Sequence, residues 1–169
     1  VTYRHLNGIG DELGTAVTVQ RMVFGNMGEH SGSGVAFTRD PTTGAAEPLG
    51  DFLLNAQGED VVAGIRNTED LDDLKRRMPE MHAELIASLA KLEQHYRDIQ
   101  DVEFTIEDGR LYILQTRSAK RHAQAAVRFA SDAVAEGMIT REEALLAIKP
   151  ETLTALLHPA FDPDVELSH

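Results

Sequence analysis

The segment of residues 100–117, which reads Q-D-V-E-F-T-I-E-D-G-R-L-Y-I-L-Q-T-R, places the tightest constraint on the fold. Polar and apolar residues alternate over residues 101–106, which predicts a strand with one face toward a core and an acidic opposite face. An Asp-Gly pair at residues 108–109 favours a tight turn, and residues 111–114 predict a second strand. The segment is therefore expected to form a β-hairpin.

The loop of this hairpin decides whether its polar side chains share one face. These side chains are Asp101, Glu103, Gln115 and Arg117. A two-residue loop at residues 108–109 would place Gln115 opposite Val102, on the core face, and leave the acids on the other face. A three-residue loop over residues 107–109, with Gly109 in the left-handed conformation as a bulge, would instead pair Asp101 with Gln115 and Glu103 with Ile113. We therefore expect the three-residue loop, with all four polar side chains on one face.

These four groups suit a metal-bound polyphosphate. Mg²⁺ takes oxygen ligands from one or two carboxylates and leaves its other positions to water and substrate phosphates, a role that Asp101 and Glu103 fit. A guanidinium grips phosphate oxygens in bidentate fashion and an amide donates to another, which gives Arg117 and Gln115 catalytic, phosphate-binding roles. An amphipathic surface hairpin with solvated charges explains the same pattern equally well.

The composition excludes several classes of protein. The 169 residues include no cysteine, which excludes disulfides and thiolate metal sites, and no apolar run approaches the roughly 20 residues of a membrane span. The 28 acids and 16 basic residues give a net charge of −12, which argues against a nucleic-acid partner and requires a cation beside any nucleoside triphosphate. No signal peptide is visible, so we expect a cytoplasmic protein without a membrane partner.

The chain changes character near residue 67. Before this point, short strand-like runs at residues 16–24, 34–38 and 51–56 are separated by loops that carry Gly and Pro. After it, apolar residues recur every three or four positions over residues 71–96, which predicts helices. The sequence therefore predicts an α+β fold.

Local signals bound these helices. Pro79 is expected to begin a new helix rather than to lie inside one. Apolar spacing over residues 123–134 predicts a further helix, which Gly137 would end. Thr140 and Glu143 form a capping box for a short third helix. We expect the apolar stripes of these helices to form a core rather than a ligand site.

Two further segments could carry chemistry. The glycine-rich loop G-N-M-G-E-H-S-G-S-G at residues 25–34 could bring backbone amides close to a phosphate, although a plain flexible loop between strands explains it better. The segment Q-G-E-D-V-V-A-G at residues 57–64 places Glu59 and Asp60 where a turn begins. These two acids could bind ribose hydroxyls or cap a short helix, and capping is the simpler explanation.

Taken together and in this order, the segments resemble the nucleotide-binding part of the pyruvate, phosphate dikinase family, which belongs to the ATP-grasp class. The matching text is G-T-A-V-T-V-Q-R-M-V-F-G-N at residues 14–26, S-G-S-G-V-A-F-T-R-D-P at residues 31–41, N-A-Q-G-E-D-V-V-A-G at residues 55–64 and the hairpin through Q-T-R at residues 115–117. Related phosphoenolpyruvate synthases usually read G-L-G-E where this chain has A-Q-G-E-D, which favours the dikinases. The resemblance covers nearly the whole chain.

The resemblance implies roles for particular residues. Glu103, Gln115 and Arg117 resemble the triphosphate and metal residues of the family, with Asp101 beside them. Asp60 resembles a nucleotide contact. The strand whose edge meets adenine corresponds to residues 20–23, which include Gln20, Met22 and Val23. The cofactor implied is Mg²⁺, with ATP as substrate and AMP as product.

The chain also departs from the family. The first ATP-grasp subdomain, which supplies a phosphate-binding lysine and arginine, would lie upstream of Val1. None of the seven histidines lies in text resembling the T-S-H-A motif that carries the phosphoryl group in the swivelling domain, and the pyruvate-binding barrel would follow further downstream. Residues 156–163 resemble the linker toward the swivelling domain. The sequence therefore indicates an excised or truncated piece of a longer enzyme.

We accordingly expect a partial ATP-grasp fold with a mainly antiparallel sheet backed by helices. Residues 1–118 would form the second subdomain of the nucleotide-binding domain, and residues 119–169 a helical tail and linker. The parent enzyme would transfer the β-phosphoryl group of ATP to a histidine and interconvert pyruvate and phosphoenolpyruvate. The alternative is a non-catalytic helical interaction module that keeps the sheet only as a scaffold.

Overall fold

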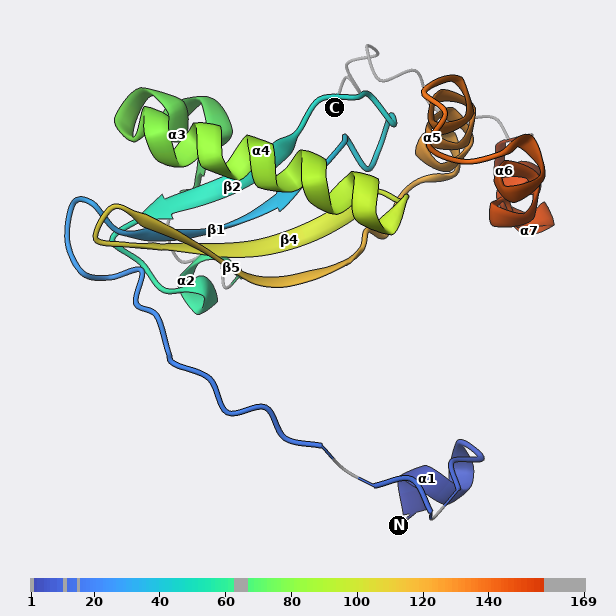
Figure 1. Cartoon of the computed structure of the whole chain (residues 1–169), viewed down its shortest axis with the longest axis horizontal. Coiled ribbons are helices and arrows are strands. Elements are labelled where there is room, and N and C mark those ends of the chain that lie inside the picture. Colours follow the sequence, from blue (N-terminus) through green and yellow to red (C-terminus); the bar gives the residue numbers. More distant parts are fainter. Residues whose placement is uncertain (1, 11, 15, 63–66, 157–169) are drawn as a thin grey trace, which may run out of the picture.

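The computed structural model describes residues 2–10, 12–14, 16–62 and 67–156, and these residues form an α+β fold (Figure 1). The strands are β1 (Gly32–Phe37), β2 (Leu49–Leu54), β3 (Glu69–Asp70), β4 (Gln100–Glu107) and β5 (Arg110–Ser118). The helices are α1 (Thr2–Leu6), α2 (Gly58–Val62), α3 (Leu71–Arg77), α4 (Pro79–Tyr96), α5 (Ala123–Ala135), α6 (Arg141–Ala147) and α7 (Pro150–Leu156).

The strands form one antiparallel sheet in the order β3-β2-β1-β4-β5. Its apolar face carries Phe52, Val102, Phe104 and Ile106, all of them buried. The period of two that predicts this face in β4 follows directly from the pleat of a strand. The predicted strands at residues 34–38 and 51–56 are confirmed as β1 and β2, each beginning two residues earlier than expected.

Two glycines of β1 make room for the rings of the neighbouring strands. A Cβ atom at Gly32 would lie 2.4 Å from the Phe52 ring, and one at Gly34 would lie 2.5 Å from the Phe104 ring. The two rings stack across the gap with their centroids 6.4 Å apart. This part of the glycine-rich text therefore serves core packing.

Helices α3 and α4 cover the apolar face of the sheet (Figure 1). Their buried leucines, among them Leu74, Leu85 and Leu89, are spaced as the sequence predicts and pack on the sheet side chains. Pro79 occupies the start of α4, which confirms its predicted place. Helix α2 lies on the other side of the sheet, where its Val61 packs with Leu53 and Ala56. On this side of the sheet, Gln115 and Arg117 of β5 are exposed.

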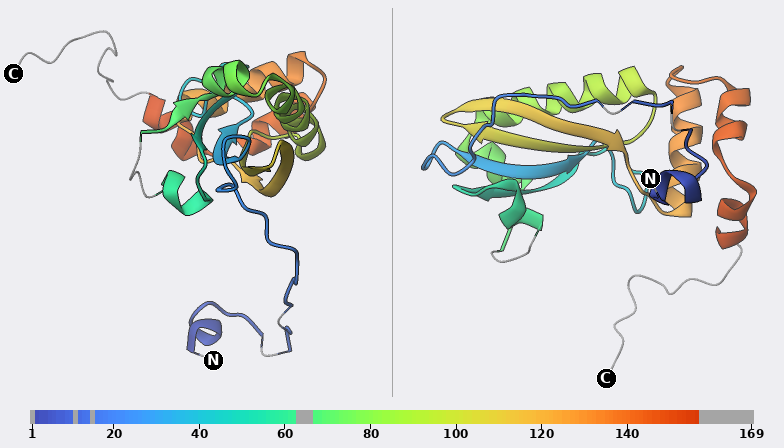
Figure 2. Two further views of the ribbon diagram at one scale, coloured as in Figure 1. Left: turned by 90° about the vertical axis from the view of Figure 1, so that its left-hand side faces the viewer. Right: turned by 90° about the horizontal axis from the view of Figure 1, so that it is seen from below.

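Helices α5, α6 and α7 stand beyond the end of the sheet where β5 finishes (Figure 2). Phe129 and Ala133 of α5 pack on Ile99 and Phe37 at this end. Gly137, with φ of 71°, follows the last turn of α5 in the left-handed conformation, and Thr140 and Glu143 form the capping box of α6. Both predicted signals are confirmed.

The predicted strand at residues 16–24 is wrong. These residues run as an extended, largely exposed arm between α1 and the sheet, and no described strand pairs with them (Figure 1). Alternation of side chains predicts which face a strand would bury, but a strand also needs a neighbouring backbone for its hydrogen bonds.

Some sequence expectations fall outside the described residues. These are the end of the segment 57–64, the linker at residues 156–163 beyond Leu156, and the histidines His158 and His169. Among the described helices, none combines the length and apolar character needed to cross a membrane.

Candidate functional site

The hairpin of β4 and β5 brings the four predicted polar side chains to one face by a route that the sequence did not predict. Glu107 pairs with Arg110, so the turn has two residues, with Asp108 and Gly109 both at positive φ. The predicted three-residue loop is wrong. A bulge at Leu114 in β5 instead adds the extra residue, after which the register continues with Glu103 opposite Gln115.

The predicted pairing of Asp101 with Gln115 and of Glu103 with Ile113 is wrong, because the bulge lies within β5 and not in the loop. Directly opposite residues of an antiparallel pair still point to the same face. Asp101 lies opposite Arg117, and Glu103 lies opposite Gln115. Val102 is fully buried on the other face. The prediction that all four polar side chains lie on one face is therefore confirmed.

Asp101 and Arg117 form an ion pair across the two strands. The Arg117 Nε donates a hydrogen bond of 2.8 Å to Asp101 Oδ2, and the Asp101 side chain is 12% exposed whereas that of Arg117 is 61% exposed. The hydrogen bond and charge of Asp101, followed by the charge of Glu103, raise the pKa of Arg117. The cation is thus fixed at its Nε end, and the rest of its donor surface faces solvent.

Glu103 and Gln115 leave hydrogen-bonding capacity free on the same face. Within the described residues, neither side chain makes a hydrogen bond to protein. The described residues contain no group of three or more His, Cys, Asp or Glu side chains suited to hold a metal ion. Asp101 and Glu103 lie two residues apart on the same face of β4.

A cavity of about 290 Å³ adjoins this row of polar groups. It is lined by Gln20, Arg21, Met22, Val23, Gln57, Gly58, Glu59, Thr105 and Leu114. Thr105 follows Glu103 on the same face of β4, and Leu114 directly precedes Gln115, so the cavity borders the polar row. The structure therefore brings the predicted segment 20–23 and Glu59 beside the hairpin. Thr105 and Leu114 carry no sequence signal beyond their places in the strands.

Asp60 faces its own helix instead of this cavity. Its Oδ2 accepts a hydrogen bond of 2.9 Å from the backbone N–H of Gln57, just ahead of α2. The capping role that the sequence favours is confirmed, and a role as a nucleotide contact stays a prediction.

Backbone amides of the glycine-rich loop likewise donate hydrogen bonds to other groups of the protein. Gly25 donates its backbone N–H to Gln57 Oε1 and Gly28 donates to Asn55 Oδ1, each at 3.1 Å. The Ser31 hydroxyl accepts from the N–H of Asp108 at 2.9 Å, which ties the loop to the hairpin turn. Because these amides are already engaged, the structural explanation of the loop accounts for them better than a phosphate cradle does.

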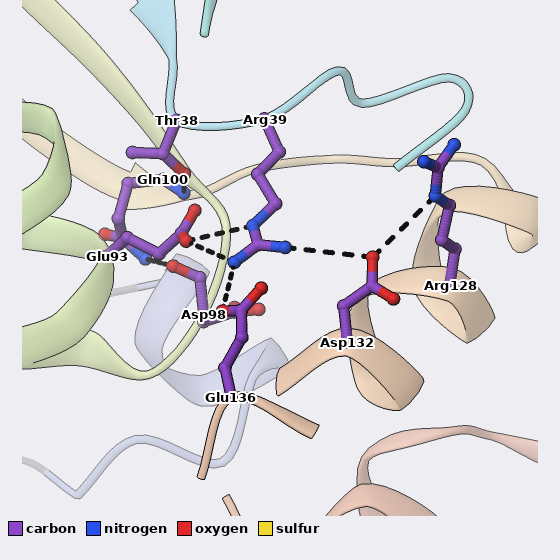
Figure 3. A network of polar contacts seen from close by, with 8 residues as sticks. All are labelled: Thr38, Arg39, Glu93, Asp98, Gln100, Arg128, Asp132 and Glu136. Carbon is purple, nitrogen blue, oxygen red and sulfur yellow. Dashed lines mark hydrogen bonds and ion pairs between the residues drawn. The ribbon is translucent and has the colours of Figure 1, made fainter. Parts of the chain in front are cut away.

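A buried arginine joins the sheet to the helices at its end, and the sequence analysis missed it (Figure 3). Arg39, which is 4% exposed, donates to Glu93 of α4 and to Glu136 after α5, and its guanidinium lies 5.2 Å from the centre of the Phe129 ring. Burial alone would lower the pKa of Arg39, but its bonds to Glu93 and Glu136 raise it. In the sequence, Arg39 stands out only as part of the motif F-T-R-D-P. Its partners Glu93 and Glu136 lie 54 and 97 residues away, so no local pattern predicts the network.

Comparison with known proteins identifies the family of this chain. The family model described as pyruvate phosphate dikinase, AMP/ATP-binding domain, matches residues 1–80 and 67–138. The pyruvate, phosphate dikinase of Clostridium symbiosum is 54% identical over 163 residues, which cover 96% of this chain and 19% of that protein. Pyruvate, phosphate dikinase 1, chloroplastic, of Arabidopsis thaliana is 53% identical over 162 residues, which cover 95% of this chain and 17% of that protein.

The match leaves most of each relative uncovered. The pyruvate, phosphate dikinase of Rhizobium meliloti (strain 1021) is 53% identical over 175 residues, again 96% of this chain but 20% of the relative. The chain thus spans about a fifth of the length of the curated relatives it matches. On the family match and these identities, the chain belongs to the family of pyruvate phosphate dikinase AMP/ATP-binding domains.

Proposed function

We propose that this chain forms part of the Mg-ATP site of a pyruvate, phosphate dikinase. The observation that carries the proposal is the register of β4 and β5, which places two carboxylates, an amide and a guanidinium on one sheet face beside a cavity. The Asp101–Arg117 ion pair would suit a plain surface hairpin, but Glu103 and Gln115 make no side-chain hydrogen bond within the described residues. Membership of an AMP/ATP-binding family supports a nucleotide as the ligand.

The triphosphate would lie over the polar row of the hairpin. Arg117 offers donors to phosphate oxygens while Asp101 holds its Nε, and the Gln115 amide can donate to a further oxygen. Asp101 and Glu103 would hold Mg²⁺, which when bound neutralises negative charge on the triphosphate. That neutralisation matters in a chain with a net charge of −12.

The nucleoside would occupy the adjoining cavity. The extended segment 20–23, with Gln20, Met22 and Val23, lines this cavity together with Glu59. The backbone of this segment would meet the adenine, and Glu59 would bind a ribose hydroxyl. Asp60 would act there indirectly, because its carboxylate caps the start of α2.

In the parent enzyme this site would serve transfer of the β-phosphoryl group of ATP to a histidine, with release of AMP. Interconversion of pyruvate and phosphoenolpyruvate would follow elsewhere in the protein. The remaining four-fifths of the relatives leaves room for the domains that such a reaction needs. In phosphoryl transfer the protein mainly positions groups and neutralises charge, so Arg117 and the metal would be the contribution of this part.

Titration of the chain by nuclear magnetic resonance with Mg-ATP and with Mg-tripolyphosphate tests the proposal, because it detects weak binding. Both probes should shift the amide signals of residues 103–105 and 115–117, and ATP should also shift those of residues 20–23. Arg117→Ala should abolish the shifts. Arg77→Ala is a matched control, because Arg77 is also half exposed and pairs with Glu69 at 2.7 Å. If neither probe shifts the hairpin signals, the proposed function is wrong.

The helical tail offers a different role, as an interaction module. A groove of about 560 Å³ between α5 and α6 has a largely apolar lining that includes Val127, Val134 and Leu145. Leu146 beside it is 86% exposed. The same titration separates the two roles, because a chain that serves only as a docking module would leave the hairpin signals unchanged.

A further inference from the structure

Glu107 of β4 holds the arm of residues 20–24 to the sheet through its side-chain carboxylate. Its Oε1 accepts a hydrogen bond from the backbone N–H of Phe24, and its Oε2 accepts one from Arg21 Nη2, each at 3.0 Å. The Glu107 side chain is 14% exposed, whereas that of Arg21 is 77% exposed. The carboxylate is therefore held at the strand end, and the arm is held to it.

The arm has a second fixed point immediately after Phe24. Gly25 donates to Gln57 Oε1 and its carbonyl accepts from the N–H of Ala56 at 2.9 Å. A Cβ atom at Gly25 would lie 2.2 Å from the Ala56 carbonyl oxygen and 2.3 Å from Ser33 Oγ, so the backbone sits directly on the sheet there. Toward α1, in contrast, the described residues 16–22 are exposed.

The direction of the arm at the cavity thus depends on Glu107. Gly25 fixes where the arm leaves the sheet, and the bond from Phe24 to Glu107 fixes the next peptide, beside residues 20–23 that line the cavity. Thr105 of the cavity wall lies on the same face of β4, two residues before Glu107. The carboxylate therefore lies where it can set the distance between the arm and the hairpin.

We propose that Glu107 is a positioning residue, which holds the backbone of residues 20–24 against the β4–β5 hairpin so that the nucleoside side of the site is formed before a ligand binds. The inference rests on the proposed function and adds the source of base selectivity to it. An extended arm without sheet partners would otherwise have to be ordered at the cost of conformational entropy on binding. A preorganised arm avoids that cost.

The two bonds of Glu107 should differ in importance. The bond from Phe24 N–H acts on the backbone and lies next to the glycine anchor, and a neutral amide oxygen can also accept it. The bond from Arg21 involves a long, solvent-exposed side chain, whose ion pairs are usually weak. Glu107→Gln and Arg21→Ala should therefore retain most of the positioning, and Glu107→Ala should lose it.

Two probes test this in the whole 169-residue chain: Mg-ATP, and Mg-tripolyphosphate, which has no base. The wild type should bind Mg-ATP at least about tenfold more tightly than Mg-tripolyphosphate, and Glu107→Ala should reduce that preference to about twofold or less. Affinity for Mg-tripolyphosphate should stay unchanged in every Glu107 variant. Glu69→Ala is a matched control, since Glu69 also accepts from an arginine, Arg77, but at the opposite edge of the sheet.

Amide hydrogen exchange without nucleotide gives an independent readout. The Phe24 amide should exchange at least about tenfold faster in Glu107→Ala than in wild type or Glu107→Gln, while the amides of β1 and β4 stay protected. An unchanged Phe24 rate, or a Glu107→Ala variant that keeps its preference for ATP, would overturn the inference alone. If the wild type binds neither Mg-ATP nor Mg-tripolyphosphate, the proposed function itself is overturned.

Discussion

The Arg39 guanidinium donates two hydrogen bonds to one oxygen of Glu93, at 2.9 Å from Nε and 2.8 Å from Nη2, inside the junction between the sheet and its helices (Figure 3). Glu93 lies 54 residues further along the chain, in the last turns of α4. Glu136 accepts from the same Nη2 at 2.7 Å. One buried cation therefore ties the end of β1 to two helices that the sequence separates widely.

Arg39→Ala should destabilise the fold by about 3–5 kcal/mol, because it would leave the largely buried Glu93 carboxylate without its cation. Replacing both partners, as in Arg39→Met with Glu93→Leu, should recover much of the loss. Arg77→Ala, which breaks an exposed ion pair, should cost less than about 1 kcal/mol. Urea unfolding followed by circular dichroism measures all three, and equal losses for Arg39→Ala and Arg77→Ala would contradict the prediction.

Gly25→Ala should destabilise the fold by about 1–3 kcal/mol, because the new methyl group would meet the Ala56 carbonyl oxygen at 2.2 Å. Since backbone atoms form this contact, the arm or β2 must move. Gly58→Ala offers the contrast, because its Cβ would meet nothing within 4 Å, and it should be neutral or slightly stabilising. Thermal unfolding of both variants gives the comparison, and a neutral Gly25→Ala would mean that the arm moves freely.

Mg²⁺ should raise the affinity of the wild type for tripolyphosphate. In Glu103→Gln this increase should be at least about tenfold smaller. The substitution keeps the size of the side chain but removes one of the two carboxylates available to the cation. Binding without Mg²⁺ should change little or improve, since a negative charge near the phosphates is lost. Titrations with and without Mg²⁺ measure the effect, and Glu69→Gln serves as control. If Mg²⁺ raises the affinity for tripolyphosphate equally in Glu103→Gln and Glu69→Gln, Glu103 is not a ligand of the cation.

The helices were predictable from sequence because their signals are local. The stripe of Leu74, Leu85 and Leu89, the proline at the start of α4 and the capping box of α6 each lie within one or two turns of the helix that they define. The shared polar face of the hairpin was also predictable, because it depends only on the parity of the register.

The rest of the site depends on contacts between distant segments. Either the loop or a strand could carry the extra residue of the hairpin, and Leu114 lies in an apolar run that gives no sign of a bulge. The Arg39 network and the contacts of Glu107 join residues 54 to 97 positions apart. A single sequence holds no periodic signal for such pairs. It also does not show whether a segment has a neighbouring strand to pair with, and the arm at residues 16–24 was therefore predicted as a strand from its side-chain pattern alone.

The remaining prediction concerns His82 of α4, which lines a cavity of about 350 Å³ together with Glu47, Asp70 and Asp72. Burial, followed by repulsion from Lys75, lowers the pKa of His82 below its usual 6.5, although Asp72 opposes the shift. The folded state therefore binds this proton less readily than the unfolded state does, and stability is fully present above pH 6.5 and falls as the pH drops below it.

His82→Gln should flatten this dependence between about pH 6.5 and pH 5. A single proton limits the slope to about 1.4 kcal/mol per pH unit, and partial exposure of His82 keeps the effect below that limit. Urea unfolding of wild type and variant across this range measures the slope directly. If both proteins lose stability equally as the pH falls, the loss comes from other groups and His82 titrates alike in the folded and unfolded states.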